Sequence, residues 1–241
     1  MTFEPSHCTF EQVRRRDPRI TDTDWLVLRG LGAEVRAAAT ALATEGKAAI
    51  DLGCGDQPYR RFFEDRGTRY VGADLGTGAE VEITSDGGVS APDANVDLVL
   101  SFQVLEHVRD LDRYLAEARR LLRADGRLLL STHGTWLYHP HPEDHRRWTR
   151  EGLVNELECR GFTVESCRAV VGPLALTTII RLTAFAYALR KVPLLGRPLT
   201  AALATVMNLR AALEDWITPE RVRENNACVY VVQAALDGSR P

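Results

Sequence analysis

The sequence lacks the features that would place it outside a reducing compartment or inside a membrane. Its five cysteines form no Cys-x-x-Cys pair, so neither a zinc ribbon nor a disulfide framework is expected. An odd number of irregularly spaced cysteines is typical of a reducing compartment. There is no run of eighteen uncharged apolar residues for a transmembrane helix, and no basic start with an apolar run for a signal peptide. These absences predict a cytoplasmic protein.

The sequence also has no excess of positive charge. Its formal net charge is -3, whereas general nucleic-acid binders carry a basic domain, so nucleic acid is not an expected partner. Internal repeats and low-complexity segments are lacking as well. With 241 residues, of which 45% are hydrophobic and 26% charged, the chain is long enough for one substantial core.

What the sequence does contain is an alternation of short apolar runs and amphipathic helical patterns. The apolar runs predict strands at 48–52, 70–74, 81–84, 96–101, 127–131, 162–171 and 227–236. Apolar residues at steps of three or four predict helices between 21 and 46 and at 59–66, 111–122 and 150–160. The alternation indicates an α/β fold, in which a doubly wound, Rossmann-like, mostly parallel sheet carries helices on both faces.

The two ends of the chain depart from this alternation. Residues 1–20 are polar and broken by Pro5 and Pro18, so we expect a loose arm there, followed by a helix that acts as a lid. We expect a single domain with four segments: an arm and lid helix at 1–46, a cofactor-binding core at 47–171, a helical insertion at 172–219, and a final strand with a tail at 220–241.

A glycine-rich turn, DLGCG at 51–55, follows the first predicted strand. Gly53 and Gly55 let the backbone turn sharply and approach a ligand. Asp51 ends the strand beside this turn, and Asp74 ends the next strand, where a carboxylate can accept both hydroxyls of a ribose or serve merely as a turn acid. Dinucleotide-binding folds have a third glycine where this chain has Pro58. The turn therefore favours a phosphate-free nucleoside over NAD.

Three motifs resemble those of the class I S-adenosylmethionine-dependent methyltransferases: DLGCGDQPYR at 51–60, VGADL at 71–75 and VLEHV at 104–108. The resemblance extends over about residues 46–165. It implies that S-adenosylmethionine is the cofactor and that these residues bind it: Asp51, Gly53, Cys54, Gly55, Tyr59, Asp74, Leu75, Asp86, Phe102, Gln103 and His107.

The resemblance also implies individual roles. Asp74 would hold the ribose hydroxyls, Leu75 would pack near adenine, and Asp86 would lie near the adenine amine. Phe102 and Gln103 would line the cofactor site. For His107 we favour a local hydrogen bond over a place in the site, because it lies where the chain re-enters a helix.

A loop rich in histidine, at residues 132–149, follows the fifth predicted strand, at the sheet edge where ligands bind. In one interpretation, His139 or His145 is oriented by Asp144 and removes a proton from the acceptor. In a second interpretation of equal weight, Asp144 and Arg147 pair and fix a lid. In a third and least favoured one, the histidines bind a metal. We expect no metal, and the catalytic candidates are His139, His145, Asp144 and His133.

The predicted insertion is basic and largely apolar. Between residues 166 and 213 there are six basic residues and no acidic one. Three interpretations remain open: a cap over the active site, a homodimer face, and a peripheral contact with an anionic membrane through 172–218. We favour a cap or dimer face.

Taken together, these features predict methyl transfer from S-adenosylmethionine to a small-molecule acceptor. We expect O-methylation of a sugar or secondary metabolite. The alternatives are N- or C-methylation of a natural-product intermediate, an NAD-dependent oxidoreductase on the same sheet, and a non-catalytic module associated with membranes.

Overall fold

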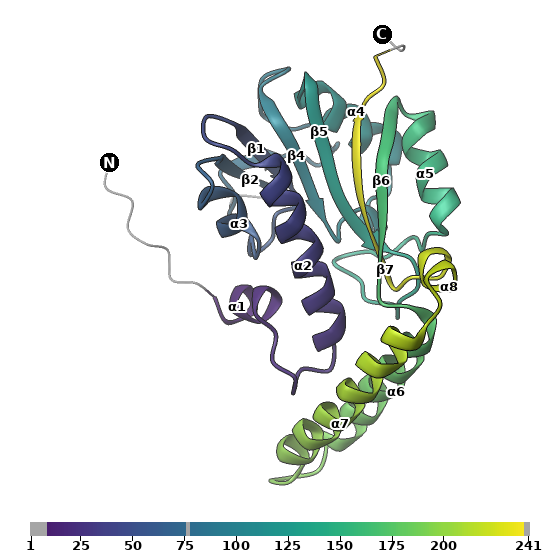
Figure 1. The fold of residues 1–241 in the computed structure, drawn as a ribbon. Coiled ribbons are helices and arrows are strands. Elements are labelled where there is room, and N and C mark those ends of the chain that lie inside the picture. The colour runs from purple at the N-terminus through teal and green to yellow at the C-terminus, as the bar shows by residue number, and fades with distance from the viewer. Residues whose placement is uncertain (1–8, 76–77, 239–241) are drawn as a thin grey trace.

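A seven-stranded sheet with helices on both faces forms the centre of the molecule (Figure 1). The computed structural model describes residues 9–75 and 78–238. The strand order is β3-β2-β1-β4-β5-β7-β6; β1 to β5 pair in parallel, and β7 is antiparallel to both neighbours. This arrangement confirms the predicted doubly wound fold. The strands are β1 Ala48–Leu52, β2 Arg69–Leu75, β3 Val81–Ile83, β4 Val96–Phe102, β5 Leu122–His133, β6 Phe162–Val170 and β7 Val229–Leu236.

The helices cover the two faces of the sheet and bury a separate apolar cluster on each. Side chains of α2 and α3, with the first turns of α6, pack on one face, and those of α4 and α5 pack on the other. Strand residues alternate between the two clusters because successive side chains of a strand point to opposite faces. The helices are α1 Phe10–Arg16, α2 Trp25–Leu42, α3 Arg60–Glu64, η1 Leu105–His107, α4 Leu111–Leu121, α5 Arg150–Cys159, α6 Pro173–Leu189, α7 Gly196–Ile217 and α8 Glu220–Asn225.

Two predicted elements differ from the structure. The expected loose arm contains the short helix α1, which begins with a capping box between Thr9 and Gln12; residues 1–8 lie outside the described part of the chain. Strand β5 begins at Leu122 rather than at residue 127, and its pairing with β4 contains a register shift between Val96 and Leu98.

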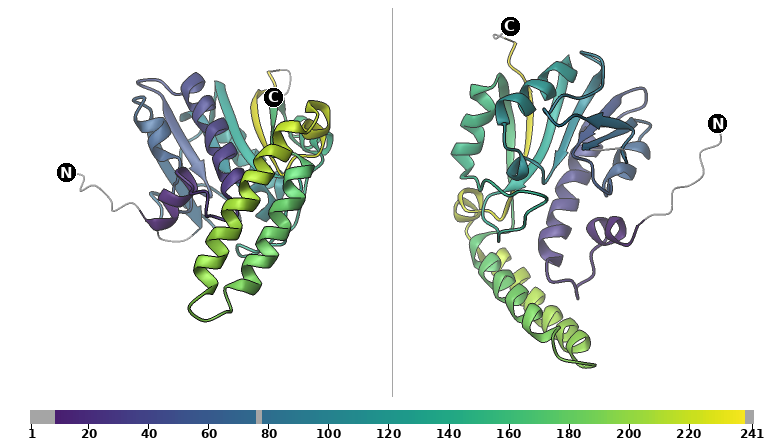
Figure 2. Two further views of the ribbon diagram at one scale, coloured as in Figure 1. Left: turned by 60° about the horizontal axis from the view of Figure 1, so that its bottom comes forward. Right: turned by 180° about the vertical axis from the view of Figure 1, so that it is seen from behind.

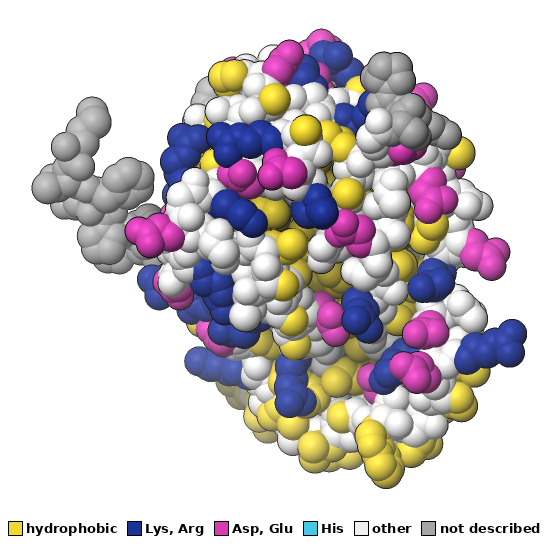
Figure 3. All heavy atoms as spheres, turned by 45° about the horizontal axis from the view of Figure 1, so that its top comes forward, with side chains coloured by type: hydrophobic (Ala, Val, Ile, Leu, Met, Phe, Trp, Pro, Cys, Tyr) yellow, Lys and Arg dark blue, Asp and Glu magenta, His cyan; other side chains and the backbone are white. Residues whose placement is uncertain are grey.

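Helices α6 and α7 form an antiparallel hairpin whose far end projects away from the sheet (Figure 2). Hydrophobic side chains gather at the lower edge of the face in Figure 3, where this hairpin lies, whereas acidic and basic side chains are interspersed over the rest of that face. No helix among the described residues is long and apolar enough to cross a membrane.

Candidate active site

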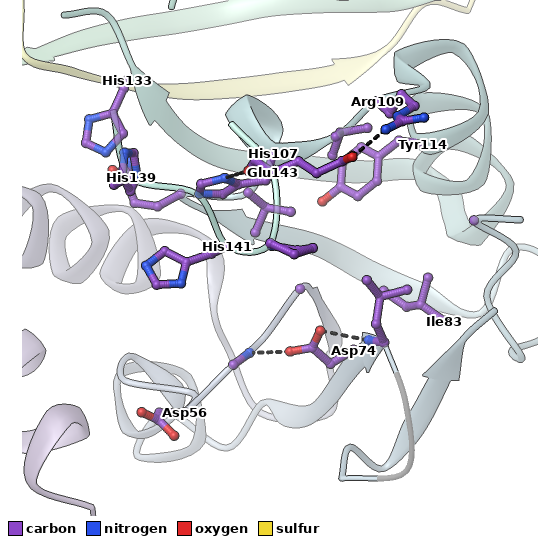
Figure 4. Close-up of a pocket in the computed structure, with 18 of the residues that line it drawn as sticks. Asp56, Asp74, Ile83, His107, Arg109, Tyr114, His133, His139, His141 and Glu143 are labelled. Atoms are coloured by element: carbon purple, nitrogen blue, oxygen red, sulfur yellow. Dashed lines mark hydrogen bonds and ion pairs between the residues drawn. The ribbon is translucent and has the colours of Figure 1, made fainter. Parts of the chain in front are cut away.

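A cavity of about 1220 Å³ opens at the carboxyl ends of the parallel strands. Ligands of open α/β sheets bind at this edge because the loops that follow the strands converge there. The wall opposite the strands comes from α1 and α2, through Arg14, Arg15, Val27, Leu28 and Leu31. Figure 4 shows Asp56 and Asp74 on one side of the cavity and a group of histidines on the other.

The glycine turn and Asp74 form the first side of the cavity. Gly53 and Gly55 have φ angles of 73° and 47°, in the left-handed region that favours glycine. A Cβ on Gly55 would meet no atom within 4 Å, so the backbone there is open to a ligand. The Asp74 carboxylate accepts hydrogen bonds from the Gly55 amide at 2.8 Å and the Leu75 amide at 2.7 Å. Both oxygens keep a further lone pair for a ligand hydroxyl.

The residues around this side fit a nucleoside. Leu75 and Ile83 line the cavity, and the Leu75 side chain is 62% exposed, which leaves an apolar surface for a flat base. Asp86 also lines it, and the Thr84 hydroxyl donates to its carboxylate at 2.5 Å. That hydrogen bond holds the pKa of Asp86 below its usual value. This side of the cavity thus presents a carboxylate, an apolar surface and a second carboxylate, a set of groups that a nucleoside could contact.

Four residues that we expected to bind the cofactor do not line the cavity. Asp51, Cys54, Tyr59 and Phe102 are buried beneath the turn. Asp51 lies on the strand face that packs against α2 and α3, and Tyr59 packs edge-on against Phe102 with ring centroids 5.1 Å apart. For Asp51 in β1 and Phe102 in β4, the alternation of side chains along a strand explains this placement. Their place is one of support for the glycine turn.

Asp51 is a buried acid with an incomplete set of partners. It accepts a hydrogen bond from the Tyr70 hydroxyl, and its Oδ1 has no hydrogen-bond partner among the described residues. Burial raises the pKa of Asp51 to about 7, although the Tyr70 hydrogen bond opposes the shift.

Gln103 and His107 line the cavity on its second side. Gln103 has a positive φ of 58°, and its amide nitrogen donates to the Ser131 hydroxyl at 3.1 Å. His107 Nδ1 lies 2.6 Å from the Glu143 carbonyl oxygen (Figure 4). This partner lies in the histidine-rich loop rather than in the local turn that we expected, and His107 lines the cavity as well.

An ion pair between Asp144 and Arg147 helps to fix the histidine-rich loop. Asp144 is 2% exposed, and its two oxygens accept from the Arg147 guanidinium at 2.5 and 2.7 Å. This pairing holds the pKa of Asp144 far below its usual value. Asp144 also accepts from the His139 amide at 2.9 Å, so the same carboxylate positions His139. The structure thus contains the pairing of our second interpretation.

The structure separates the four catalytic candidates. His133 and His139 line the cavity, whereas Asp144 and His145 do not. His145 Nε2 instead lies 3.1 Å from Glu143, outside the cavity lining. Burial lowers the pKa of His139 and brings that of His133 to about 3, so both rings are neutral at neutral pH.

Sequence reasoning missed Glu106, which lies beside the two cavity histidines. It is 0% exposed, and burial raises its pKa to about 7. Its Oε1 lies 3.5 Å from His133 Nε2, and one ligand-type atom of each of Glu106, His133 and His139 lies within 4.8 Å of the other two. The only sequence signal was its position after β4, in the VLEHV motif.

Comparisons with known proteins agree with this geometry. A family model described as a methyltransferase domain matches residues 28–166. A probable S-adenosylmethionine-dependent methyltransferase of Mycolicibacterium smegmatis is 28% identical over 142 residues, 52% of this chain and 55% of that protein. Another from Mycobacterium tuberculosis is 36% identical over 89 residues, 34% of this chain and 32% of that protein. The chain therefore spans about half or less of the length of these relatives.

Among solved structures, the fold resembles a chain from the complex of the Haloferax volcanii Trm112 methyltransferase activator with its methyltransferase partner. The TM-score is 0.56 at 16% identity, over 93% of this chain and 96% of that one. Identity this low shows a shared fold alone, and it agrees with the family model that covers more than half of the chain. The chain belongs to the methyltransferase domain family.

Proposed function

We propose that this protein transfers a methyl group from S-adenosylmethionine to the oxygen of a small molecule, with a sugar or a secondary metabolite as the expected acceptor. One observation carries the proposal. A single cavity joins the nucleoside side, with Asp74 and the glycine turn, to a wall that carries His133 and His139, whose pKa values are lowered by burial (Figure 4). The first side suits the donor and the second suits an acceptor with a proton to lose.

Methyl transfer to a hydroxyl requires mainly that the two substrates are positioned and that a group accepts the hydroxyl proton. When bound, the cofactor supplies a methyl group whose carbon–sulfur bond breaks, leaving its electron pair on sulfur, as the acceptor oxygen bonds to carbon. His139 is the ring best placed to take the hydroxyl proton. Its Nδ1 lies 3.0 Å from the Leu137 carbonyl oxygen, which can only accept, and 3.3 Å from the Arg147 guanidinium; the shorter contact favours a proton on Nδ1 and a lone pair on Nε2.

The donor is tested by calorimetry with S-adenosylhomocysteine and with NAD. We expect only the first to bind, and Asp74→Asn to weaken it roughly 10- to 100-fold, because charge-assisted hydrogen bonds contribute about 1.5–3 kcal/mol. Asp56→Asn, which changes another acid of the lining, is the matched control and is expected to bind like wild type. Binding of NAD alone would support the oxidoreductase alternative instead.

A screen with labelled methyl donor would then identify the acceptor.

We also propose that the α6–α7 hairpin binds an anionic membrane surface. None of its described residues lines the cavity, so the hairpin does not cap the site. Its tip exposes Leu194 at 97% and Leu195 at 61%, beside exposed Arg190, Lys191 and Arg197. Apolar side chains within a basic rim suit the boundary between anionic headgroups and acyl chains. A lipid-linked or apolar acceptor fits this location.

A further inference from the structure

Three side chains of metal-binding type meet on the histidine wall of the cavity. Glu106 comes from η1, His133 ends β5, and His139 lies in the loop that follows. One ligand atom from each lies within 4.8 Å of the other two. Figure 4 shows the His133 and His139 rings next to each other on this wall. The spacing of the three along the chain matches no metal motif, because the sheet edge brings them together.

Glu106 presents a buried oxygen with no partner to this group. Its Oε2 accepts from the Thr132 hydroxyl at 2.8 Å, whereas its Oε1 faces His133 Nε2 at 3.5 Å. Oε1 has no hydrogen bond within the described part of the chain, although the side chain is 0% exposed. Leaving a buried carboxylate oxygen unsatisfied is costly, and a cation at this point would satisfy it.

Hydrogen bonds from neighbouring residues hold the side chains of Glu106 and His139, as they commonly do for metal ligands in proteins. His139 Nδ1 lies 3.0 Å from the Leu137 carbonyl oxygen, which can only accept, and 3.3 Å from the Arg147 guanidinium, which can only donate. The shorter contact with Leu137 favours the proton on Nδ1, and Nε2 then offers a lone pair. The Thr132 hydroxyl holds the second oxygen of Glu106. The nearby Arg147 guanidinium is engaged by both oxygens of Asp144. Its charge is offset there, which lessens its repulsion of a cation.

We propose that Glu106, His133 and His139 bind a divalent first-row transition metal, with Zn²⁺ as its best representative. Two imidazoles and one carboxylate form a ligand set that suits this class of ion. Ligand atoms of a tetrahedral zinc site are roughly 3.4 Å apart, so side-chain movements of about 1 Å close the group around the ion. Three protein ligands leave a coordination position open to the cavity.

The catalytic role of the ion rests on the proposed methyl transfer. The binding of the ion to the protein does not depend on that proposal. An acceptor hydroxyl at the open position would lose its proton more readily, since a bound cation lowers the pKa of an oxygen ligand. His139 then serves as a ligand, and the acceptor proton passes to solvent or to a neighbouring base.

Metal binding is tested on protein stripped with a chelator. Zn²⁺ is titrated by calorimetry, and Co²⁺ is followed by its visible absorption bands. We expect one ion per chain in wild type. Glu106→Gln, which keeps the shape and the Thr132 hydrogen bond, and His139→Gln, on a half-buried ring, are each expected to weaken Zn²⁺ binding more than roughly 100-fold. His141→Gln is the matched control, because His141 lines the same cavity with its ring centroid 6.1 Å from that of His139.

S-adenosylhomocysteine is titrated into the same samples to separate the two proposals. Unchanged affinity for it in the variants shows that they are folded. A wild-type protein that binds S-adenosylhomocysteine but no stoichiometric Zn²⁺ would overturn the metal site alone, as would a His141→Gln variant that loses the ion as the other two do. Zn²⁺ binding without S-adenosylhomocysteine binding would refute the donor assignment and leave the metal site standing.

Discussion

His139 and His145 lie six positions apart in one loop, yet they differ in what they face. His139 lines the cavity, whereas His145 pairs with Glu143 outside the lining. We therefore expect His139→Ala to lower turnover roughly 100-fold or more and to leave the cofactor affinity unchanged. The loss is expected whether His139 acts as the base or as a metal ligand. His145→Ala is the matched control and is expected to keep turnover within about two-fold. Initial rates with the identified acceptor measure both, and equal losses in the two variants would contradict the assignment.

Asp51 predicts a pH dependence of stability with a definite sign. Its pKa is about 7 in the folded protein and about 3.9 in an unfolded chain, so between these values only the folded state holds the proton. The contribution of Asp51 to the free energy of unfolding is complete below pH 4 and is lost as the pH rises towards 7, by up to about 1.4 kcal/mol per pH unit.

Asp51→Asn removes this titration, so we expect its free energy of unfolding to fall less than that of wild type between pH 5 and 7. Urea denaturation of the cofactor-free protein at several pH values measures the difference. Asp56→Asn, an exposed acid five residues along, is the control and is expected to keep the wild-type slope. The same slope in the Asp51 variant would show that this carboxyl is ionised throughout.

Individual residues of the cavity and its surroundings show which features of the site can be predicted from the sequence and which cannot. Asp74 was foreseen because the end of a parallel strand fixes its side chain at the ligand edge. Asp51 and Tyr59 stand in the same motif, but their side chains face the core, and a motif does not state which way each side chain points. Glu106 was missed because burial and a missing hydrogen-bond partner are properties of the folded state.

At the scale of elements, the periodicity of apolar residues predicted where the strands and most helices lie in the sequence. It did not predict which strands lie next to each other in the sheet. Helix α1 has no buried residues and so lacks the apolar period on which the prediction depended, although its capping box at Thr9 and Gln12 could have located it. Strand β7 was expected at 227–236 and occurs at Val229–Leu236. Its insertion between β5 and β6 depends on long-range pairing, which no local pattern encodes.

The exposed apolar and basic side chains of the α6–α7 hairpin indicate the kind of surface that the hairpin would contact. It exposes Leu194 and Leu195 at its tip and Trp216 near its base, while no acid occurs between residues 166 and 213. Pairing of two such tips in a dimer would bring their basic residues together, whereas anionic lipid would neutralise them. The charge therefore favours a membrane surface over a second copy of the chain.

We expect the protein to co-sediment with vesicles containing phosphatidylserine and not with neutral phosphatidylcholine vesicles. Leu194→Glu combined with Leu195→Glu is expected to lower the bound fraction at least roughly ten-fold, because it removes the apolar tip and adds negative charge. Val222→Glu changes an exposed apolar residue of α8 and serves as the control. Unchanged vesicle binding, with loss of a dimer in light scattering, would instead assign the tip to self-association.

Over the whole molecule, the cavity joins segments that are distant in the sequence. The wall from α1 and α2 precedes the first strand, the turn at 53–56 follows it, and the histidine wall follows β5. Helix α1 is attached to this assembly by few contacts: the Gln12 amide donates to the Asp56 carbonyl in the glycine turn, and Arg14 pairs with Asp24. A short helix with no buried residues and exposed hydrogen bonds opens readily.

Ligand binding should therefore stabilise α1 more than the rest of the fold. We expect S-adenosylhomocysteine to slow amide hydrogen exchange in α1, in the turn at 53–57 and in 83–87, and to leave α6 and α7 unchanged, because only the first three border the cavity. Gln12→Ala removes the contact with the turn together with the capping box at Thr9, and is therefore expected to reduce the protection of α1 both with and without the ligand. Protection of the turn without protection of α1 would contradict the expected stabilisation of this helix by the ligand.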